Sequence, residues 1–252
     1  MPPWPRLSAE RPPVIPERIE GSGWLVLIGG GEFSFEETER ADAAWLAKVS
    51  EIAGNEGTVG FLPAASGSDD YARHFAVYLD EYFERSCEVI PIYRPRDARR
   101  GKNAERVRAT DAIYLGGGVP DHLLDTLQGE DGEGSPVAEA LRSKLETGGV
   151  LVAIAGVAQA CGYAARSVFG GKTIVGFGWL RHGVVEPNFE TGRDRRLRQL
   201  LEFPGVRWGL AIPAGSAVLL GPGGAVEVVG EAWLATNPEA SLVPLESSPA
   251  PN

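Results

Sequence analysis

From residue 24 onward, short apolar runs alternate with longer segments whose apolar residues recur at helical spacing. Apolar strands that alternate with amphipathic helices favour parallel pairing, with helices on both faces of the sheet. The pattern therefore predicts an α/β fold, a three-layer sandwich around a mainly parallel sheet. The strands expected are WLVLI (24–28), TVGFL (58–62), CEVIPIY (87–93), DAIYLGGG (111–118) and VLVAIA (150–155).

Local signals place two of these elements more closely. Ser135 precedes Pro136 and an apolar face, and Gly148 follows it, so a helix is expected to begin at Pro136 and to end before Gly148. Pro91 lacks a backbone N–H, which places the third strand near an edge of the sheet or at a bulge.

After about residue 171 the pattern changes to short strands punctuated by glycine, interrupted by one helix around 193–201. Such runs predict C-terminal antiparallel strands or edge hairpins added to the parallel sheet. We expect a single α/β domain over residues 23–235. Residues 1–22 form a proline-rich N-terminal arm in this interpretation, and residues 236–252 form a C-terminal tail.

Composition narrows the class of protein. The 252 residues carry a formal net charge of −10, which argues against nucleic acid as a partner. No apolar run is long enough to span a membrane, and the N-terminus lacks the apolar region of a signal peptide, so a cytoplasmic protein is expected. Both cysteines are expected to be small core residues rather than a disulfide framework.

Four loops follow the predicted parallel strands, and ligands bind at this edge of open parallel sheets. The loops are GGGEF (29–33), PAASGSDD (63–70), GGGVPDH (116–122) and AGVAQ (155–159). The glycine triplet lacks the spacing of a dinucleotide fingerprint, and no histidine or cysteine spacing typical of a metal site occurs. Neither a cofactor nor a metal is therefore expected.

The segment VLVAIAGVAQACG (150–162) has the strand–turn–helix layout of a nucleophile elbow. Here the chain resembles the cyanophycinase and dipeptidase E family of serine peptidases over about residues 23–230. That family reads Gly-x-Ser-Ala-Gly-Ala at the elbow and has a glutamine amidotransferase-like fold with a flavodoxin-like core. Placing its first glycine on Gly156 puts Ala158 at the serine position. A shift of one residue gives Val157 or Gln159, so no register supplies a hydroxyl or a thiol.

Three further family motifs can be matched to this sequence. In each of them the apolar and glycine positions are retained, whereas the polar residues of the family are replaced. GGVPDHL (117–123) keeps both glycines of Gly-Gly-Asn/Asp-Gln-x-x-Leu but has Val119 and Pro120 at its polar positions. VEPNF (185–189) matches Val-Asp-x-His-Phe with Asn188 at the histidine position. WGLAIPA (208–214) matches Gly-Ile-Gly-Ile-Asp-Glu without its two acids. The resemblance implies the family fold without its catalytic serine and histidine.

Three functions are compatible with these residues. In the first, the chain is a catalytically inactive homologue that retains a crevice for a small molecule or peptide. In the second, it is an active hydrolase with a relocated site that uses His122 and a serine of residues 64–70. Alternatively, it is an interaction or structural protein, and proteins that resemble this family are commonly homodimers. No catalytic residue is assigned, and the pocket is expected to be lined by Gly30, Gly31, Ser66, Gly117, Gly118, Asp121, His122, Gln159 and Glu186.

Overall fold

A computed structural model describes residues 16–128 and 134–250 of the chain. Most of the N-terminal arm expected for residues 1–22 falls on residues 1–15, outside the described residues, as do residues 251–252 of the expected tail. Within the described ranges, no helix has the length and apolar character needed to cross a membrane.

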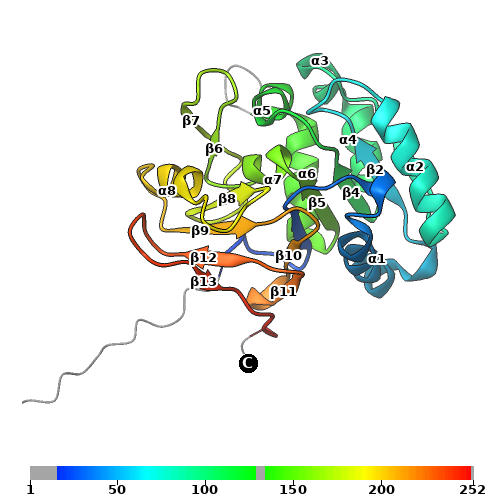
Figure 1. The fold of residues 1–252 in the computed structure, drawn as a ribbon. Helices are drawn as coiled ribbons and strands as arrows, with labels where there is room; N and C mark the ends of the chain where they lie inside the picture. The colour runs from blue at the N-terminus through cyan, green and yellow to red at the C-terminus, as the bar shows by residue number, and fades with distance from the viewer. Residues whose placement is uncertain (1–15, 129–133, 251–252) are drawn as a thin grey trace, which may run out of the picture.

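A seven-stranded sheet forms the centre of the molecule, in the order β11-β10-β1-β5-β4-β2-β3 (Figure 1). The five strands from β1 to β3 in this order are parallel to their neighbours, whereas β10 runs antiparallel to both β1 and β11. The mainly parallel sheet and its antiparallel extension are therefore confirmed. The strands are β1 (Trp24–Ile28), β2 (Val59–Leu62), β3 (Cys87–Val89), β4 (Ala112–Leu115), β5 (Val150–Ile154), β10 (Ala217–Leu220) and β11 (Val226–Val229).

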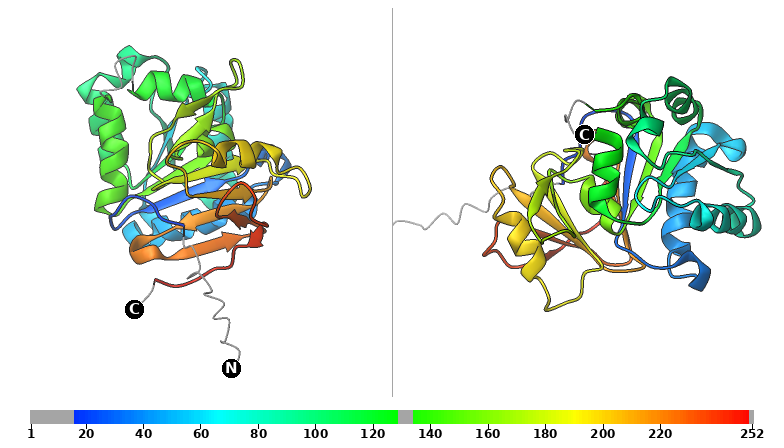
Figure 2. Two further views of the ribbon diagram at one scale, coloured as in Figure 1. Left: turned by 90° about the vertical axis from the view of Figure 1, so that its left-hand side faces the viewer. Right: turned by 90° about the horizontal axis from the view of Figure 1, so that it is seen from above.

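Helices cover both faces of this sheet, which gives the three expected layers (Figure 2). One apolar cluster joins the sheet to α1 and α2, and another joins its opposite face to α4, α5 and α6. The helices are α1 (Glu39–Ala53), α2 (Asp70–Phe83), α3 (Pro95–Ala98), α4 (Gly101–Ala109), α5 (Pro120–Gln128) and α6 (Pro136–Thr147). Three short 3-10 helices are η1 (Phe33–Phe35), η2 (Gly54–Glu56) and η3 (Pro222–Gly224).

The local signals in the sequence match the structure closely. The side chain of Ser135 accepts a hydrogen bond from the N–H of Ala138 at 3.1 Å, and α6 begins at Pro136. Gly148 ends that helix with a φ of 116°, a left-handed conformation that glycine adopts without strain. β3 lies at the edge of the sheet and ends before Pro91.

The C-terminal part of the chain departs from the expected antiparallel pattern in one respect. β8 pairs in parallel with β9 in a separate four-stranded sheet, of order β13-β12-β9-β8. The helix α8 connects β8 to β9 and returns the chain to its starting end, so the two strands run in the same direction. These elements are β6 (Ala164–Arg166), α7 (Gly156–Ala160), β7 (Thr173–Val175), β8 (Gly183–Pro187), α8 (Arg195–Leu201), β9 (Trp208–Ile212), β12 (Trp233–Ala235) and β13 (Val243–Pro244).

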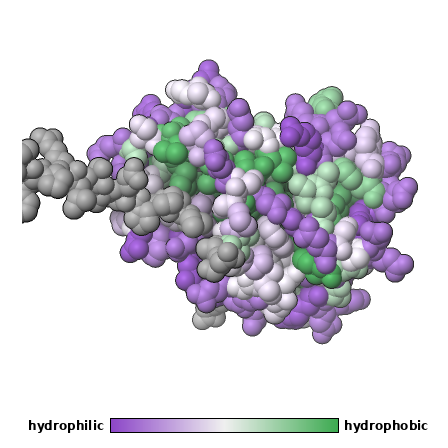
Figure 3. Space-filling model, turned by 90° about the horizontal axis from the view of Figure 1, so that it is seen from below, coloured by the Kyte–Doolittle hydropathy of each residue, from purple (hydrophilic) through white to green (hydrophobic). Residues whose placement is uncertain are grey.

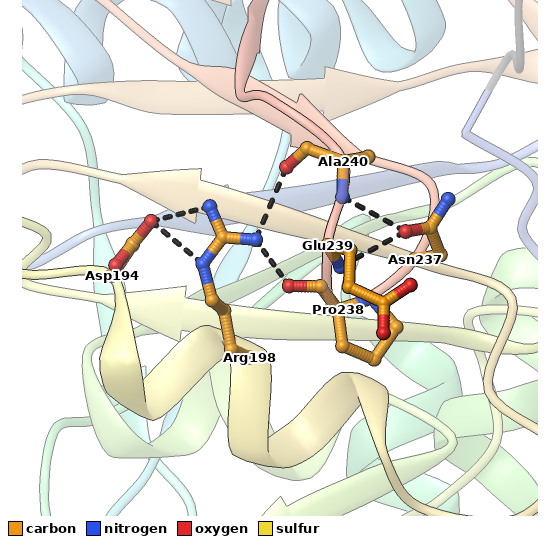
Figure 4. Close-up of polar contacts among 6 residues, drawn as sticks. All are labelled: Asp194, Arg198, Asn237, Pro238, Glu239 and Ala240. Atoms are coloured by element: carbon orange, nitrogen blue, oxygen red, sulfur yellow. Dashed lines mark hydrogen bonds and ion pairs between the residues drawn. The ribbon is translucent and has the colours of Figure 1, made fainter.

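Two arginines fix the segments that flank the α/β domain. Buried Arg18 donates hydrogen bonds to the backbone oxygens of Leu220 and Gly21, and so holds residues 18–23 against the sheet. Arg198 of α8 pairs with Asp194 and donates to the carbonyl of Ala240 at 3.1 Å, which ties the segment after β12 to the helix (Figure 4). Part of the arm and part of the tail are therefore packed on the domain.

A buried carboxylate holds the loop after β1 in place. Asp42 of α1 accepts hydrogen bonds from Thr38 at 2.7 Å, Trp45 Nε1 at 2.8 Å and the Tyr78 hydroxyl at 3.2 Å. Above it, the Phe33 ring packs on Tyr78, with centroids 5.1 Å apart. Burial raises the pKa of Asp42 to about 6, although these three hydrogen bonds oppose the shift.

The pH dependence of stability should reveal this group. Folded Asp42 keeps its proton to a higher pH than the unfolded chain does, so its contribution lowers the free energy of unfolding as the pH rises from about 4 to about 6. Asp42→Asn keeps the shape without the charge and should gain about 3 kcal/mol relative to the wild type across that range. Urea unfolding at several pH values measures this difference, and a difference that stays constant would contradict the assignment.

Candidate active site

The chain makes a strained turn where β5 ends. Ala155 has φ 53° and ψ −127°, and α7 begins at the next residue, Gly156. An alanine with positive φ is sterically disfavoured, and strained residues of this kind cluster at functional sites. Strand, strained residue and helix together form the geometry of a nucleophile elbow, with Ala155 at the position where a nucleophile is displayed.

This turn lies three residues before the position that the sequence alignment selected. Ala158 lies inside α7 and is completely buried, and so is Val157. Ala155 is only half-buried, and its N–H donates to the carbonyl of Ile28 at 2.9 Å. A side chain at Ala158 points into the core, so the backbone geometry favours Ala155 as the elbow residue. Neither residue carries a hydroxyl or a thiol.

Asn188 lies beside this turn, at the same edge of the sheet. It is exposed, follows β8 and has a φ of 48°. Its N–H donates to the carbonyl of Gly29 at 2.7 Å, and the carbonyl of the preceding residue, Ile28, accepts from Ala155. Gly30 has a φ of 146°, and a Cβ built there would lie 2.0 Å from Asn188 Oδ1. The end of β1 therefore holds Ala155 and Asn188 next to one another.

Glycines allow the neighbouring turns to approach closely at this edge. A Cβ on Gly118 would lie 2.6 Å from the backbone carbonyl atoms of Ala65, and one on Gly156 would lie 2.8 Å from the Gly118 oxygen. The turns after β2, β4 and β5 therefore touch through backbone atoms. The N–H groups of Gly30, Gly31, Gly117 and Gly118 have no acceptor among the described residues.

Glu186 is a strongly buried acid of β8, two residues before Asn188. Its side chain is 4% exposed, and Oε1 lies 3.9 Å from Arg166 Nη2. Oε2 is buried and has no hydrogen-bond partner within the described residues. Burial raises the pKa of Glu186, and the charges of Arg166 and Arg196 partly offset the shift. An unsatisfied buried oxygen is costly, so a donor from a ligand would stabilise it.

Two residues expected in the pocket, Gln159 and Asp121, form hydrogen bonds with the backbone. Gln159 is buried; its Nε2 donates to the Val185 carbonyl at 3.3 Å, and its Oε1 accepts from the Arg166 N–H at 2.9 Å. Asp121 accepts from the Val168 N–H at 3.0 Å and holds the β6–β7 loop. Their polar groups therefore satisfy backbone donors and acceptors within the protein.

Ser66 and His122 meet elsewhere, as lining residues of a cavity of about 890 Å³ beyond the β2 and β4 turns. The Ser66 hydroxyl donates within its own loop, to the carbonyl of Pro63 at 3.3 Å or to that of Ser68 at 3.1 Å. No hydrogen bond joins His122 to a serine among the described residues. A relocated serine nucleophile would need that bond, so the geometry does not favour this alternative.

The sequence reasoning missed Ala155 and Arg166. An elbow residue directly follows its strand, and the expected strand end at residue 155 was the signal for Ala155. No local sequence signal indicates a role for Arg166, because its partner Glu186 lies on β8, 20 positions later in the sequence. In the described ranges, no three histidine, cysteine, aspartate or glutamate residues come close enough together to hold a metal ion.

The central sheet, its helical layers and the elbow define an α/β scaffold of the kind that supports serine hydrolysis. The chain belongs to peptidase family S51, whose sequence profile matches residues 25–227. It is similar in structure to a peptidase from an acI-B1 Actinobacterium, with a TM-score of 0.67 and 20% identity over 90% of this chain and 96% of the other.

A second similar structure is a putative peptidase E protein from Listeria monocytogenes EGD-e. Its TM-score is 0.55 at 15% identity, over 83% of this chain and 98% of the other. At these identities the two likenesses establish the fold. No curated protein matches the sequence.

Proposed function

We propose that this member of peptidase family S51 binds a small molecule or peptide in the crevice at the ends of β1 and β5 without hydrolysing it. The observation that carries the proposal is the alanine at the strained elbow. Its methyl group cannot attack a carbonyl carbon, and the amide of Asn188 cannot take up a proton near neutral pH. A covalent mechanism at this turn therefore lacks both its nucleophile and its base.

The crevice nevertheless keeps groups that suit a ligand. The glycine N–H groups at the ends of β1 and β4 offer donors for a carbonyl or carboxylate oxygen. Glu186 Oε2 offers a buried acceptor for an amide N–H or an ammonium group. A peptide or amino-acid derivative carries both kinds of group, which supports a ligand of that class.

A ligand screen tests the proposal directly. Aspartyl dipeptides, isoaspartyl peptides and cyanophycin fragments are incubated with the protein, and both the melting temperature and the products are measured. We expect at least one compound to raise the melting temperature by mass action, with no product formed. Hydrolysis of any compound in the panel would contradict the proposal, and so would the absence of binding across the panel.

Glu186→Gln should weaken binding of the compound that the screen identifies. Loss of a charge-assisted hydrogen bond to a buried carboxylate is expected to reduce the affinity about tenfold, measured by calorimetry. Glu190→Gln is the matched control, because Glu190 is exposed and pairs with Arg193 near the same strand end. Equal losses in both variants would contradict a role for Glu186 in the site.

The homodimer stays a prediction. In the view of Figure 3, apolar residues form separate patches among polar ones. We propose no interface from this pattern, and light scattering would give the oligomeric state.

A further inference from the structure

A cavity lies at the carboxyl edge of the sheet, beside the turns after β2 and β3. Its volume is about 890 Å³, and the loops after β2 and β3 and the first turns of α5 line it. Ala155, Asn188 and Gly30 are not among its lining residues. The side chains that line it include Ser66, Ser68 and His122, the arginines Arg94, Arg96 and Arg100, and the aspartates Asp69, Asp97 and Asp125.

The chain topology opens this cavity. β2 leads into α2 on one face of the sheet, whereas its two neighbours, β3 and β4, lead into α4 and α5 on the other face. The connections leave the edge in opposite directions, so a crevice remains between them. Ligands in open α/β sheets bind at such switch points. The β1–β5 pair, where Ala155 lies, forms a separate switch point of this sheet.

The lining of the cavity holds three arginines and three aspartates, which differ in how closely they are paired. Arg94 forms no ion pair within the described residues. Arg96 and Arg100 share one buried acid, Asp97, at 3.9 and 3.6 Å, distances that leave most guanidinium N–H donors free. The carboxylate of Asp69 pairs with Arg73 at 2.5 Å and opposes a bound anion less than a free acid would.

We propose that this cavity binds an oxyanion, a phosphate or carboxylate group of a small molecule, through Arg94, Arg96 and Arg100. Guanidinium groups bind such planar or tetrahedral oxygen groups through paired N–H donors. Ser66, Ser68 and His122 also line the cavity and supply further polar contacts. This site is separate from the crevice proposed above at the ends of β1 and β5, and it does not depend on that proposal.

Titrations of the full chain with inorganic phosphate and, separately, with succinate test the site at low ionic strength. Chemical shifts of backbone amides report where each probe binds. We expect saturable shifts in the loops 64–69 and 91–97, and the probe that binds more tightly identifies a phosphate or a dicarboxylate as the ligand class. Added sodium chloride should weaken binding, because it screens the exposed guanidinium groups.

Substitutions make the assignment specific. Arg94→Gln should weaken binding about tenfold, whereas Arg99→Gln should leave it unchanged, because Arg99 lies in the same segment but does not line the cavity. Asp125→Asn should strengthen binding about threefold by removing a carboxylate from the wall. Equal effects at Arg94 and Arg99, or no saturable shift with either probe, would overturn the proposal. Neither result would bear on the peptide crevice.

Discussion

A fluorophosphonate probe should leave the wild-type protein unlabelled, while Ala155→Ser combined with Asn188→His becomes labelled at residue 155. The probe needs an activated serine oxygen, and the elbow of the wild type offers only a methyl group. Each missing catalytic partner typically costs several orders of magnitude in rate. The two substitutions place a hydroxyl and an imidazole where the end of β1 already holds the two backbones together.

Ala158→Ser combined with Asn188→His is the matched control for this experiment. Residue 158 is fully buried in α7, so a serine there cannot reach the probe. Mass spectrometry of the intact protein and of its peptides measures both the extent and the position of labelling. Labelling of the wild type, or of the residue 158 variant rather than the residue 155 variant, would contradict our assignment of the elbow.

Gly118→Ala should destabilise the protein by about 4 kcal/mol, which is a large part of the stability of an ordinary domain. Gly118 has a φ of 157°, and a methyl group there would lie 2.6 Å from the backbone of Ala65. Neither backbone can move without separating the turns after β2 and β4. Because Gly156 also packs on this turn, the substitution should disturb the elbow as well.

Gly67→Ala is the control that separates the cost of backbone strain from the cost of steric contact at residue 118. Gly67 also has a positive φ, of 69°, but a methyl group there would meet nothing within 4 Å. Its cost should be limited to backbone strain of about 1 kcal/mol. Denaturant unfolding of both variants measures the contrast, and equal losses would show that contact with Ala65 is not what requires glycine at residue 118.

The two proposed sites use the same edge of one sheet for different chemistry. At the β1–β5 switch point the proposed ligand groups are backbone amides, together with the buried carboxylate of Glu186 on β8, and they suit a molecule with both donors and acceptors. At the β2–β4 switch point they are arginine side chains, which suit an anion. Variants at Glu186 and Arg94 affect only one site each, so the two titrations can fail or succeed independently.

Much of the fold could be predicted from local sequence. Alternating apolar strands and amphipathic helices indicated the parallel sheet and its layers, because burial on both faces requires that pattern. Ser135 and Gly148 marked the ends of α6, since capping depends on residues next to one another in sequence. The absence of a serine, threonine or cysteine from residues 155–159 was also readable directly, and it did not depend on the register chosen.

Tertiary structure decided the remaining features. The elbow lies at Ala155 because pairing with β1 fixes the end of β5 at Ile154. The motif match placed the elbow three residues later, because it contained no information about where the strand ends. Glu186, Gln159 and Asp121 have partners 20, 26 and 47 positions away in Arg166, Val185 and Val168, so their contacts were not visible locally. The sequence by itself determined which elements form and which reacting groups are missing, because these depend on residue type and short-range spacing. Only the folded chain determined which of these positions face a crevice, because that depends on contacts between residues far apart in sequence.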